Sequence, residues 1–234
     1  MPETRLSRAE AGLRRRRHAA TAWPILYGLL ACIAVTALSV GFLDRPIALF
    51  VHAQSPARPG ILQNFTLQDF LQAMTRIPEL LGALAIFLIV GLGLLRLVRG
   101  RLARVPEIGF LAALSMIVAE AIKTALKLAC GRTWPETWVN NNPSFLRDGI
   151  YGFFPFHGGH GWAAFPSGHT TIVCACMAVL WLLLPRWRPL YALAIAATAL
   201  GLLGMNYHFL GDILAGAYLG CAVGVATVRI GSAT

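Results

Sequence analysis

Residues 108–129 read IGFLAALSMIVAEAIKTALKLA, and this stretch decides the fold class. A helix rises about 1.5 Å per residue, so about 20 apolar residues cross the roughly 30 Å hydrocarbon core of a bilayer. The stretch has that length and carries three charged side chains, Glu120, Lys123 and Lys127, all in its second half. We therefore expect a membrane-spanning helix from Ile108 to Ala129.

The same signal recurs through the rest of the chain. Of its 234 residues, 57% are hydrophobic and 13% are charged, whereas a soluble domain carries about a quarter charged residues. The low charge favours the bilayer as the main solvent. We predict an all-α, polytopic membrane protein with six transmembrane helices, at Trp23 to Phe42, Glu79 to Leu97, Ile108 to Ala129, Pro166 to Leu184, Leu190 to Met205 and Phe209 to Val228.

The net charge of +10 would suggest a nucleic-acid partner in a soluble protein. Here the basic residues lie mostly in short clusters between apolar runs, so we interpret them as a signal of membrane topology. Cytoplasmic loops of inner-membrane proteins hold the excess of lysine and arginine. With six spans the clusters fall on one side, at Arg5, Arg8, Arg14 to Arg17, Arg96, Arg99, Arg101, Arg104, Arg186, Arg188 and Arg229. We expect a multi-pass protein of the bacterial inner membrane with both termini in the cytoplasm.

This topology divides the chain into a basic cytoplasmic arm at 1–22, a membrane domain at 23–229 and a cytoplasmic tail at 230–234. A cleaved signal peptide is the competing interpretation of the first apolar run. That run is longer than the usual apolar core of roughly 7–15 residues, so we expect an uncleaved span.

Two long connections are expected on the outer side. Residues 43–78 contain a turn signal at 54–60, and the apolar residues after it, from Leu62 to Met74, predict an amphipathic helix on the outer surface. A connecting helix packed on the bundle is the alternative. Residues 130–165 are rich in aromatic side chains and glycine. Aromatic rings gather at membrane interfaces because they are amphipathic, and the sharper hypothesis is a lid that seats a lipid headgroup.

Charged residues within spans face a protein interior or a wet cavity. Glu120, Lys123 and Lys127 lie at positions i, i+3 and i+7, on one helix face. We interpret Glu120 and Lys123 as an ion pair that stabilises the bundle. Lys127 is nearer the outer end and precedes a turn at 131–135 that contains Arg132, so both side chains are candidates to bind a phosphate.

Two further polar segments fall on the same side of the predicted membrane. Ser167 and Gly168 open the fourth span with a hydroxyl and an unobstructed amide, where the helix dipole favours an anion, although helix capping is the structural alternative. His169 stands beside that position and can exchange a proton with a phosphate. His208 and Asp212, at i and i+4, can meet on a helix, so that the carboxylate orients the ring and leaves one nitrogen free to attack.

With these residues the chain resembles the type 2 phosphatidic acid phosphatase superfamily. The family pattern is Lys, six residues, Arg-Pro; then Pro-Ser-Gly-His; then Ser-Arg, five residues, His, three residues, Asp. The second part is complete at Pro166 to His169, and His208 with Asp212 reproduces the end of the third. The resemblance covers roughly Lys123 to Val228 and implies the helical bundle of that family.

Both family arginines are missing from their usual places. Trp134 stands where the first is expected, and Gly201-Leu202 replaces Ser-Arg ahead of His208. A phosphoryl-transfer transition state needs positioned cations and hydrogen-bond donors. We expect Arg132 to supply one guanidinium, and further substrate contacts from Asn206, His157, His160, Arg147 and Trp134.

The resemblance implies a mechanism without a metal or other cofactor. His208 forms a phosphohistidine, Asp212 holds its tautomer, and His169 protonates the leaving oxygen and later activates water. The phosphoryl oxygens are held by Lys127, Arg132, Ser167 and Gly168.

The expected partners are the lipid bilayer and a lipid phosphate or pyrophosphate at the outer leaflet, and the oligomeric state stays open. The leading expectation is an integral membrane phosphatase that hydrolyses a phosphate monoester or pyrophosphate of a lipid at the periplasmic face. Two alternatives to it remain: a phosphotransferase that uses the same intermediate, and a non-catalytic lipid-binding or transport protein that keeps the fold.

Overall fold

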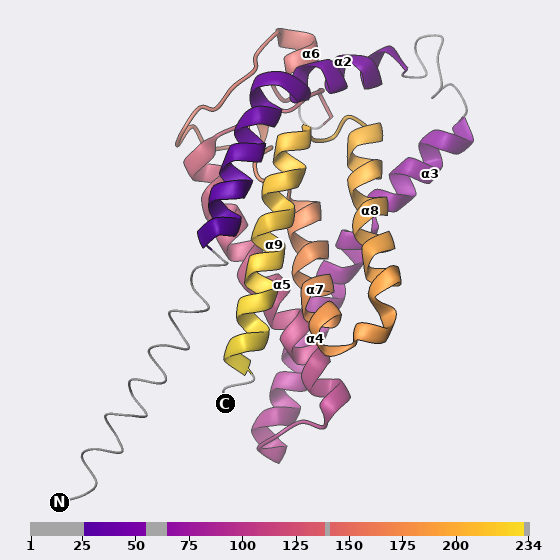
Figure 1. The fold of residues 1–234 in the computed structure, drawn as a ribbon, viewed down its shortest axis with the longest axis vertical. Coiled ribbons are helices and arrows are strands. Elements are labelled where there is room, and N and C mark those ends of the chain that lie inside the picture. The colour runs from indigo at the N-terminus through magenta and orange to yellow at the C-terminus, as the bar shows by residue number, and fades with distance from the viewer. Residues whose placement is uncertain (1–25, 55–64, 139–140, 232–234) are drawn as a thin grey trace, which may run out of the picture.

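The computed structural model describes residues 26–54, 65–138 and 141–231, and within them the chain is a bundle of helices with isolated β-bridges and no strand (Figure 1). The all-α prediction is confirmed, and the predicted arm at 1–22 lies outside the described residues. A helix at residues 26–38 comes first. The elements after it are η1 (Ser39–Leu43), α2 (Asp44–Ala53), α3 (Phe65–Thr75), α4 (Ile77–Arg99), α5 (Arg104–Cys130), α6 (Phe145–Asp148), η3 (His160–Trp162), α7 (Gly168–Leu183), η4 (Pro185–Trp187), α8 (Arg188–Gly204) and α9 (Leu210–Gly231).

Five helices of the described chain are long and apolar enough to cross a membrane: Leu26–Ala53, Leu67–Arg99, Arg104–Cys130, Pro185–Gly204 and Leu210–Gly231. The protein is therefore a multi-pass membrane protein. The span expected at Pro166 to Leu184 is α7, an apolar helix of 16 residues. At about 1.5 Å per residue it is shorter than a bilayer core, so the count of six spans is not confirmed.

The short helix α7 lies at the centre of the bundle and packs on α4, α5, α8 and α9. Glycines of α9 allow the closest of these approaches. A Cβ atom on Gly220 would lie 2.3 Å from the Thr171 carbonyl oxygen, and one on Gly224 would lie 2.7 Å from that of Ala175. Small residues bring membrane helices into backbone contact in this way. Because α7 is surrounded by protein and not by lipid, it does not need the full length of a span.

The loops separate into two sets at opposite ends of the bundle (Figure 1). Helices α2 and α6 and the turn from α8 to α9 lie at one end, near the top of the view. The α4–α5 connection, the α7–α8 turn and the end of α9 lie at the other. These last three segments carry the predicted cytoplasmic arginines that fall within the described residues. The arginine-rich loops that were predicted to be cytoplasmic and the loops that were predicted to face outward are therefore at opposite ends of the bundle.

Residues 43–78 contain two described helices, α2 before the predicted turn and α3 after it. α2 continues the first helix beyond the π-helical turn η1 and lies across the end of the bundle (Figure 1). α3 instead packs on α8 and leads into α4. The contact is close, since a Cβ atom on Gly201 would lie 2.7 Å from the Leu71 carbonyl oxygen. α3 thus matches the alternative, a connecting helix packed on the bundle.

Candidate active site

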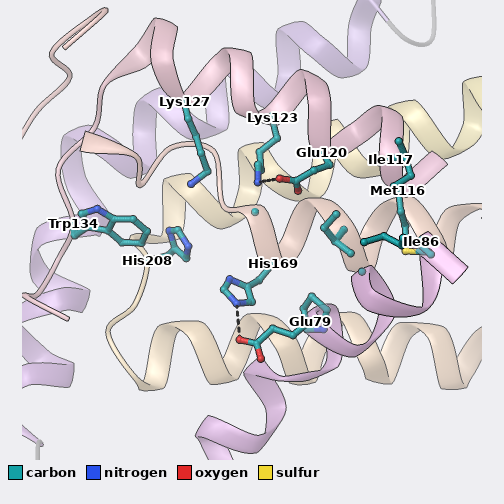
Figure 2. A pocket seen from close by; sticks show the side chains of 15 residues that line it. Glu79, Ile86, Met116, Ile117, Glu120, Lys123, Lys127, Trp134, His169 and His208 are labelled. Atoms are coloured by element: carbon teal, nitrogen blue, oxygen red, sulfur yellow. Dashed lines mark hydrogen bonds and ion pairs between the residues drawn. The ribbon is translucent and has the colours of Figure 1, made fainter. Parts of the chain in front are cut away.

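A cavity of about 420 Å³ lies among α4, α5 and α7 (Figure 2). Ionisable side chains line one part of it, and apolar side chains line the part between α4 and α5. It brings together residues that lie far apart in the sequence. Its lining residues are Pro78, Glu79, Gly82, Ala85, Ile86, Met116, Ile117, Glu120, Lys123, Lys127, Trp134, Gly168, His169, Ile172 and His208.

His208 lies in the turn before α9, and its ring reaches the cavity although only 3% of the residue is exposed. Its Nδ1 atom is 3.5 Å from Oδ2 of Asp212, one helical turn later. The same oxygen accepts the Phe209 backbone N–H at 3.0 Å. The Nδ1 contact is long for a hydrogen bond. Asp212 faces Nδ1, which leaves Nε2 available to the cavity.

His169 faces His208 from the first turn of α7, and their ring centroids are 6.3 Å apart (Figure 2). On its other side, His169 Nε2 lies 3.6 Å from a carboxylate oxygen of Glu79, which comes from the start of α4. Glu79 was not predicted from the sequence, because no local pattern links the start of α4 to α7. The rings of both histidines line the same cavity.

The N-terminus of α7 forms part of the cavity wall. Ser167 is fully buried and caps the helix, since its hydroxyl accepts the Thr170 N–H at 3.5 Å. Gly168 lines the cavity, and a Cβ atom there would lie 3.1 Å from the Lys123 side chain. Ser167 therefore caps α7, which was the alternative to anion binding for this residue. Gly168, which is partly exposed, is the residue at this N-terminus that lines the cavity.

Two lysines of α5 line the cavity (Figure 2). Lys127 donates to the Ala163 carbonyl and lies 5.4 Å from the centre of the Trp134 ring. Lys123 forms the predicted ion pair with Glu120, with 2.5 Å between Nζ and Oε1. Lys123 also lines the cavity, and this position was not predicted from the sequence. Its position four residues before Lys127, on the same helix face, was the available signal.

Arg132 does not reach the cavity. Its guanidinium is fully buried and donates to Asp212 Oδ1 at 2.5 Å and to Asp44 Oδ2 at 2.6 Å. The ring centres of Phe153 and Phe209 lie within 4.8 Å of its central carbon, which adds cation–π contacts. This geometry argues against the expected phosphate-binding role, because two carboxylates already occupy the terminal nitrogens.

Trp134 stands in the place of the first family arginine and forms a wall of the cavity. Its ring centroid lies 5.0 Å from that of His208. The indole N–H donates to the His160 carbonyl at 2.8 Å, which fixes the ring. Trp134 thus limits the space beside His208.

Of the other residues expected to contact the substrate, one lines a cavity near the two histidines and three do not. His160 lines a second cavity beside the first. Asn206 is buried, and its side chain donates to the Ala48 carbonyl at 3.1 Å, away from both cavities. His157 is exposed and stacks on Trp162, and Arg147 pairs with the neighbouring Asp148. Neither His157 nor Arg147 lines either cavity.

The second cavity, of about 470 Å³, joins the first where both are lined by Glu79, Trp134, His169 and His208. Among its polar and aromatic lining residues are Gln72, Arg76, Trp138, Asn142 and Tyr207. The two histidines therefore lie where an apolar space and a more polar space meet.

The arrangement combines a buried imidazole with a carboxylate partner, a second imidazole, and two ammonium groups beside a helix N-terminus. These groups suit nucleophilic attack, proton transfer and stabilisation of negative charge. Within the described ranges, no group of three or more His, Cys, Asp or Glu side chains could hold a metal ion.

The sequence model of the PAP2 superfamily matches residues 108–233, more than half of the chain. The chain belongs to the PAP2 superfamily. The predicted resemblance is confirmed, and the match includes α5, α7, α8 and α9. Both histidines, both lysines and Asp212 therefore fall within the family region of this PAP2 protein, whereas Glu79 lies before it.

Two curated relatives carry the name lipid A 1-phosphatase. The protein from Rhizobium johnstonii is 28% identical over 116 residues, which are 50% of this chain and 45% of that protein. The one from Rhizobium etli is 29% identical over 106 residues, or 45% of this chain and 43% of that protein. The matched part of the chain thus spans less than half the length of each relative.

A solved structure shares the fold of this PAP2 protein. It is the transmembrane PAP2-type phosphatidylglycerolphosphate phosphatase from Bacillus subtilis, with a TM-score of 0.57 and 15% sequence identity. The alignment covers 89% of this chain and 96% of that one. The likeness therefore extends to the helices before residue 108.

Proposed function

We propose that this PAP2 protein hydrolyses a phosphate monoester or pyrophosphate of a lipid, at the periplasmic face, through a phosphohistidine intermediate. The observation that carries the proposal is the pair of imidazoles, His208 and His169, whose centroids lie 6.3 Å apart in one cavity. An in-line displacement needs a nucleophile and a leaving-group acid on opposite sides of phosphorus, and this pair supplies both.

In the first step His208 Nε2 attacks phosphorus, the bond from phosphorus to the leaving oxygen breaks, and His169 gives that oxygen a proton. In the second step water attacks phosphorus and gives a proton to His169, the phosphorus–nitrogen bond breaks, and inorganic phosphate leaves. Asp212 keeps the proton on Nδ1 of His208 through both steps.

The negative charge of the phosphoryl group requires cations in place of the missing family arginines. Lys123 and Lys127 line the cavity, beside the N-terminus of α7 at Gly168. Ammonium groups and backbone amides together stabilise the equatorial oxygens of a phosphoryl group. In this proposal the two lysines replace Arg132 as the phosphate-binding cations.

The cavity also favours a lipid over a water-soluble phosphate. Ile86, Met116 and Ile117 line its apolar part, which suits an acyl or prenyl chain. The names of the relatives and of the solved structure make lipid A 1-phosphate and phosphatidylglycerophosphate the first substrates to test. Phosphatidic acid and a polyprenyl pyrophosphate complete the panel.

The periplasmic assignment rests on charge. The arginine-rich turns lie at the end of the bundle opposite to α2 and α6, and such turns face the cytoplasm. With that orientation the end that carries α2, α6 and the turn with His208 faces outward.

The test is a colorimetric assay of phosphate release by the purified protein from the four lipids. We expect release from at least one lipid, a loss of about a thousandfold or more in His208→Ala, and parent-like rates in His157→Ala, whose ring lies outside both cavities. A His208→Ala variant as active as the parent would sink the nucleophile assignment.

The same assay separates the alternatives. Transfer of labelled phosphate to an added lipid or sugar alcohol, without release of inorganic phosphate, would favour a phosphotransferase. No release and no transfer from any lipid would favour a non-catalytic lipid-binding protein.

A further inference from the structure

A buried group of three charged side chains lies behind His208, on the side away from the cavity. Arg132 donates from one terminal nitrogen to Asp212 and from the other to Asp44, at 2.5 and 2.6 Å. The side chains of all three residues are fully buried. Asp44 precedes Arg132 by 88 residues and is the first residue of α2, directly after η1. This contact links the N-terminal helix to the candidate active site.

Asp44 is held firmly in place. Its Oδ1 atom accepts the Ser39 hydroxyl at 2.6 Å and the Gly211 backbone N–H at 2.9 Å. Ser39 opens the π-helical turn η1, and Asp44 follows that turn directly. π-helical turns recur at functional sites because they redirect a side chain within a helix. A Cβ atom on Gly211 would lie 3.1 Å from Asp44 Oδ2, so the glycine leaves space for the carboxylate.

The charges of this group do not cancel. One guanidinium faces two carboxylates, so the group carries one excess negative charge with no solvent around it. Buried charge without a partner is costly. Next to it, Nδ1 of His208 is buried and makes no hydrogen bond, because its nearest carboxylate oxygen, Oδ2 of Asp212, is 3.5 Å away. A positive charge on His208 would balance the excess negative charge and strengthen the contact of Nδ1 with Asp212. In the proposed mechanism, attack by Nε2 on phosphorus creates that positive charge.

We propose that Asp44 is a positioning residue for phosphoryl transfer: through Arg132 it fixes the Asp212 carboxylate against His208, and it supplies the excess negative charge that stabilises the charged imidazole. This inference rests on the proposed function. The other groups that face His208 are Lys127 and His169, both on the cavity side. On the cavity side, the negative charge of the phosphoryl group balances the positive charge of Lys127. Asp44, Arg132 and Asp212 lie on the opposite side of the His208 ring, where their excess negative charge faces the imidazole.

The role predicts a selective loss. Asp44→Asn keeps the size of the side chain and removes the excess charge, so binding of the ground state is retained while the transition state loses stabilisation. We expect kcat to fall by about tenfold or more, with KM changed by less than about twofold. Asp44→Glu, which restores the charge, should recover part of kcat. Asp69→Asn, at an exposed carboxylate of α3, is the matched control and should behave like the parent.

The deciding measurement is calorimetric binding of two anions to the purified full-length protein. Vanadate adopts the five-coordinate geometry of the transition state on a histidine, whereas inorganic phosphate resembles the ground state. We expect Asp44→Asn to weaken vanadate binding about tenfold and to leave phosphate binding unchanged. Unchanged vanadate binding, or an equal loss for both anions, would overturn the proposal.

A second variant decides the question if Asp44→Asn does not fold. Ser39→Ala removes one donor to Asp44 and keeps every charge, so we expect a loss of about threefold for vanadate and none for phosphate. Equal vanadate affinities of Ser39→Ala and the parent would then overturn the proposal. These binding data do not require turnover, so a parent protein that releases no phosphate would contradict the proposed function and not the role of Asp44.

Discussion

At the scale of single residues, the burial of His208 determines its charge state. Burial lowers its pKa to about 4, and Asp212 opposes this shift only in part. Lys127 and His169 lower the pKa further, and the ordinary value for histidine is about 6.5. A lowered pKa means that the neutral, nucleophilic ring predominates at every pH above about 4. In the proposed mechanism, His208 can therefore attack phosphorus at neutral pH without first losing a proton.

This state can be measured by an NMR titration of the ring signals of His208 in the detergent-solubilised protein. We expect a midpoint near 4, well below the ordinary value of about 6.5 for histidine, with His208→Ala used to assign the signal. A midpoint near 6.5 would show that the ring is more hydrated than this structure has it.

The sequence predicted the contact between His208 and Asp212 because helix geometry is local, so i and i+4 side chains must lie close together. It could not predict the partners of Arg132, since Asp44 lies 88 residues away and no periodic pattern links them. Without those partners, Arg132 was interpreted as a free guanidinium. The position of Lys123 on the face of Lys127 was visible in the sequence, but its ion pair with Glu120 was taken as its whole role.

At the scale of helices, the short central helix α7 depends on the glycines of α9. Hydropathy identified α7 as apolar, but an apolar run does not distinguish a helix surrounded by lipid from one surrounded by protein. Gly216, Gly220 and Gly224 recur at every fourth residue, which is the pattern of a closely packed helix face. That pattern could have indicated a central partner for α9.

This packing predicts the effect of Gly220→Val. A Cβ atom at that position would lie 2.3 Å from the Thr171 carbonyl oxygen, so α7 and α9 must separate. We expect a loss of about 1–3 kcal/mol of stability, typical of overpacking, seen as a lower thermal unfolding midpoint in detergent. Activity should fall as well, because α7 carries His169 and α9 carries Asp212. Gly91→Val is the control, since a Cβ atom there meets nothing within 4 Å; an equal loss in both variants would contradict the packing argument.

At the scale of the whole molecule, the two ends of the bundle differ in charge. We predict that a cysteine at His157, in the aromatic connection, reacts with a membrane-impermeant maleimide in intact bacterial cells. A cysteine at Arg101, in the α4–α5 connection, should react only after the cells are broken. Both positions are exposed, and the five native cysteines would be replaced by alanine. The reverse pattern of labelling would place the site on the cytoplasmic face.

The proposed mechanism depends most on the covalent intermediate at His208. The direct measurement is to mix the purified protein with a lipid carrying a labelled terminal phosphate, quench in alkali within the first turnover, and locate the label by peptide mapping. We predict an acid-labile label on the peptide that contains His208, absent from His208→Ala and present in His157→Ala. Turnover by the parent without a covalent label, or with the label on another residue, would contradict the account.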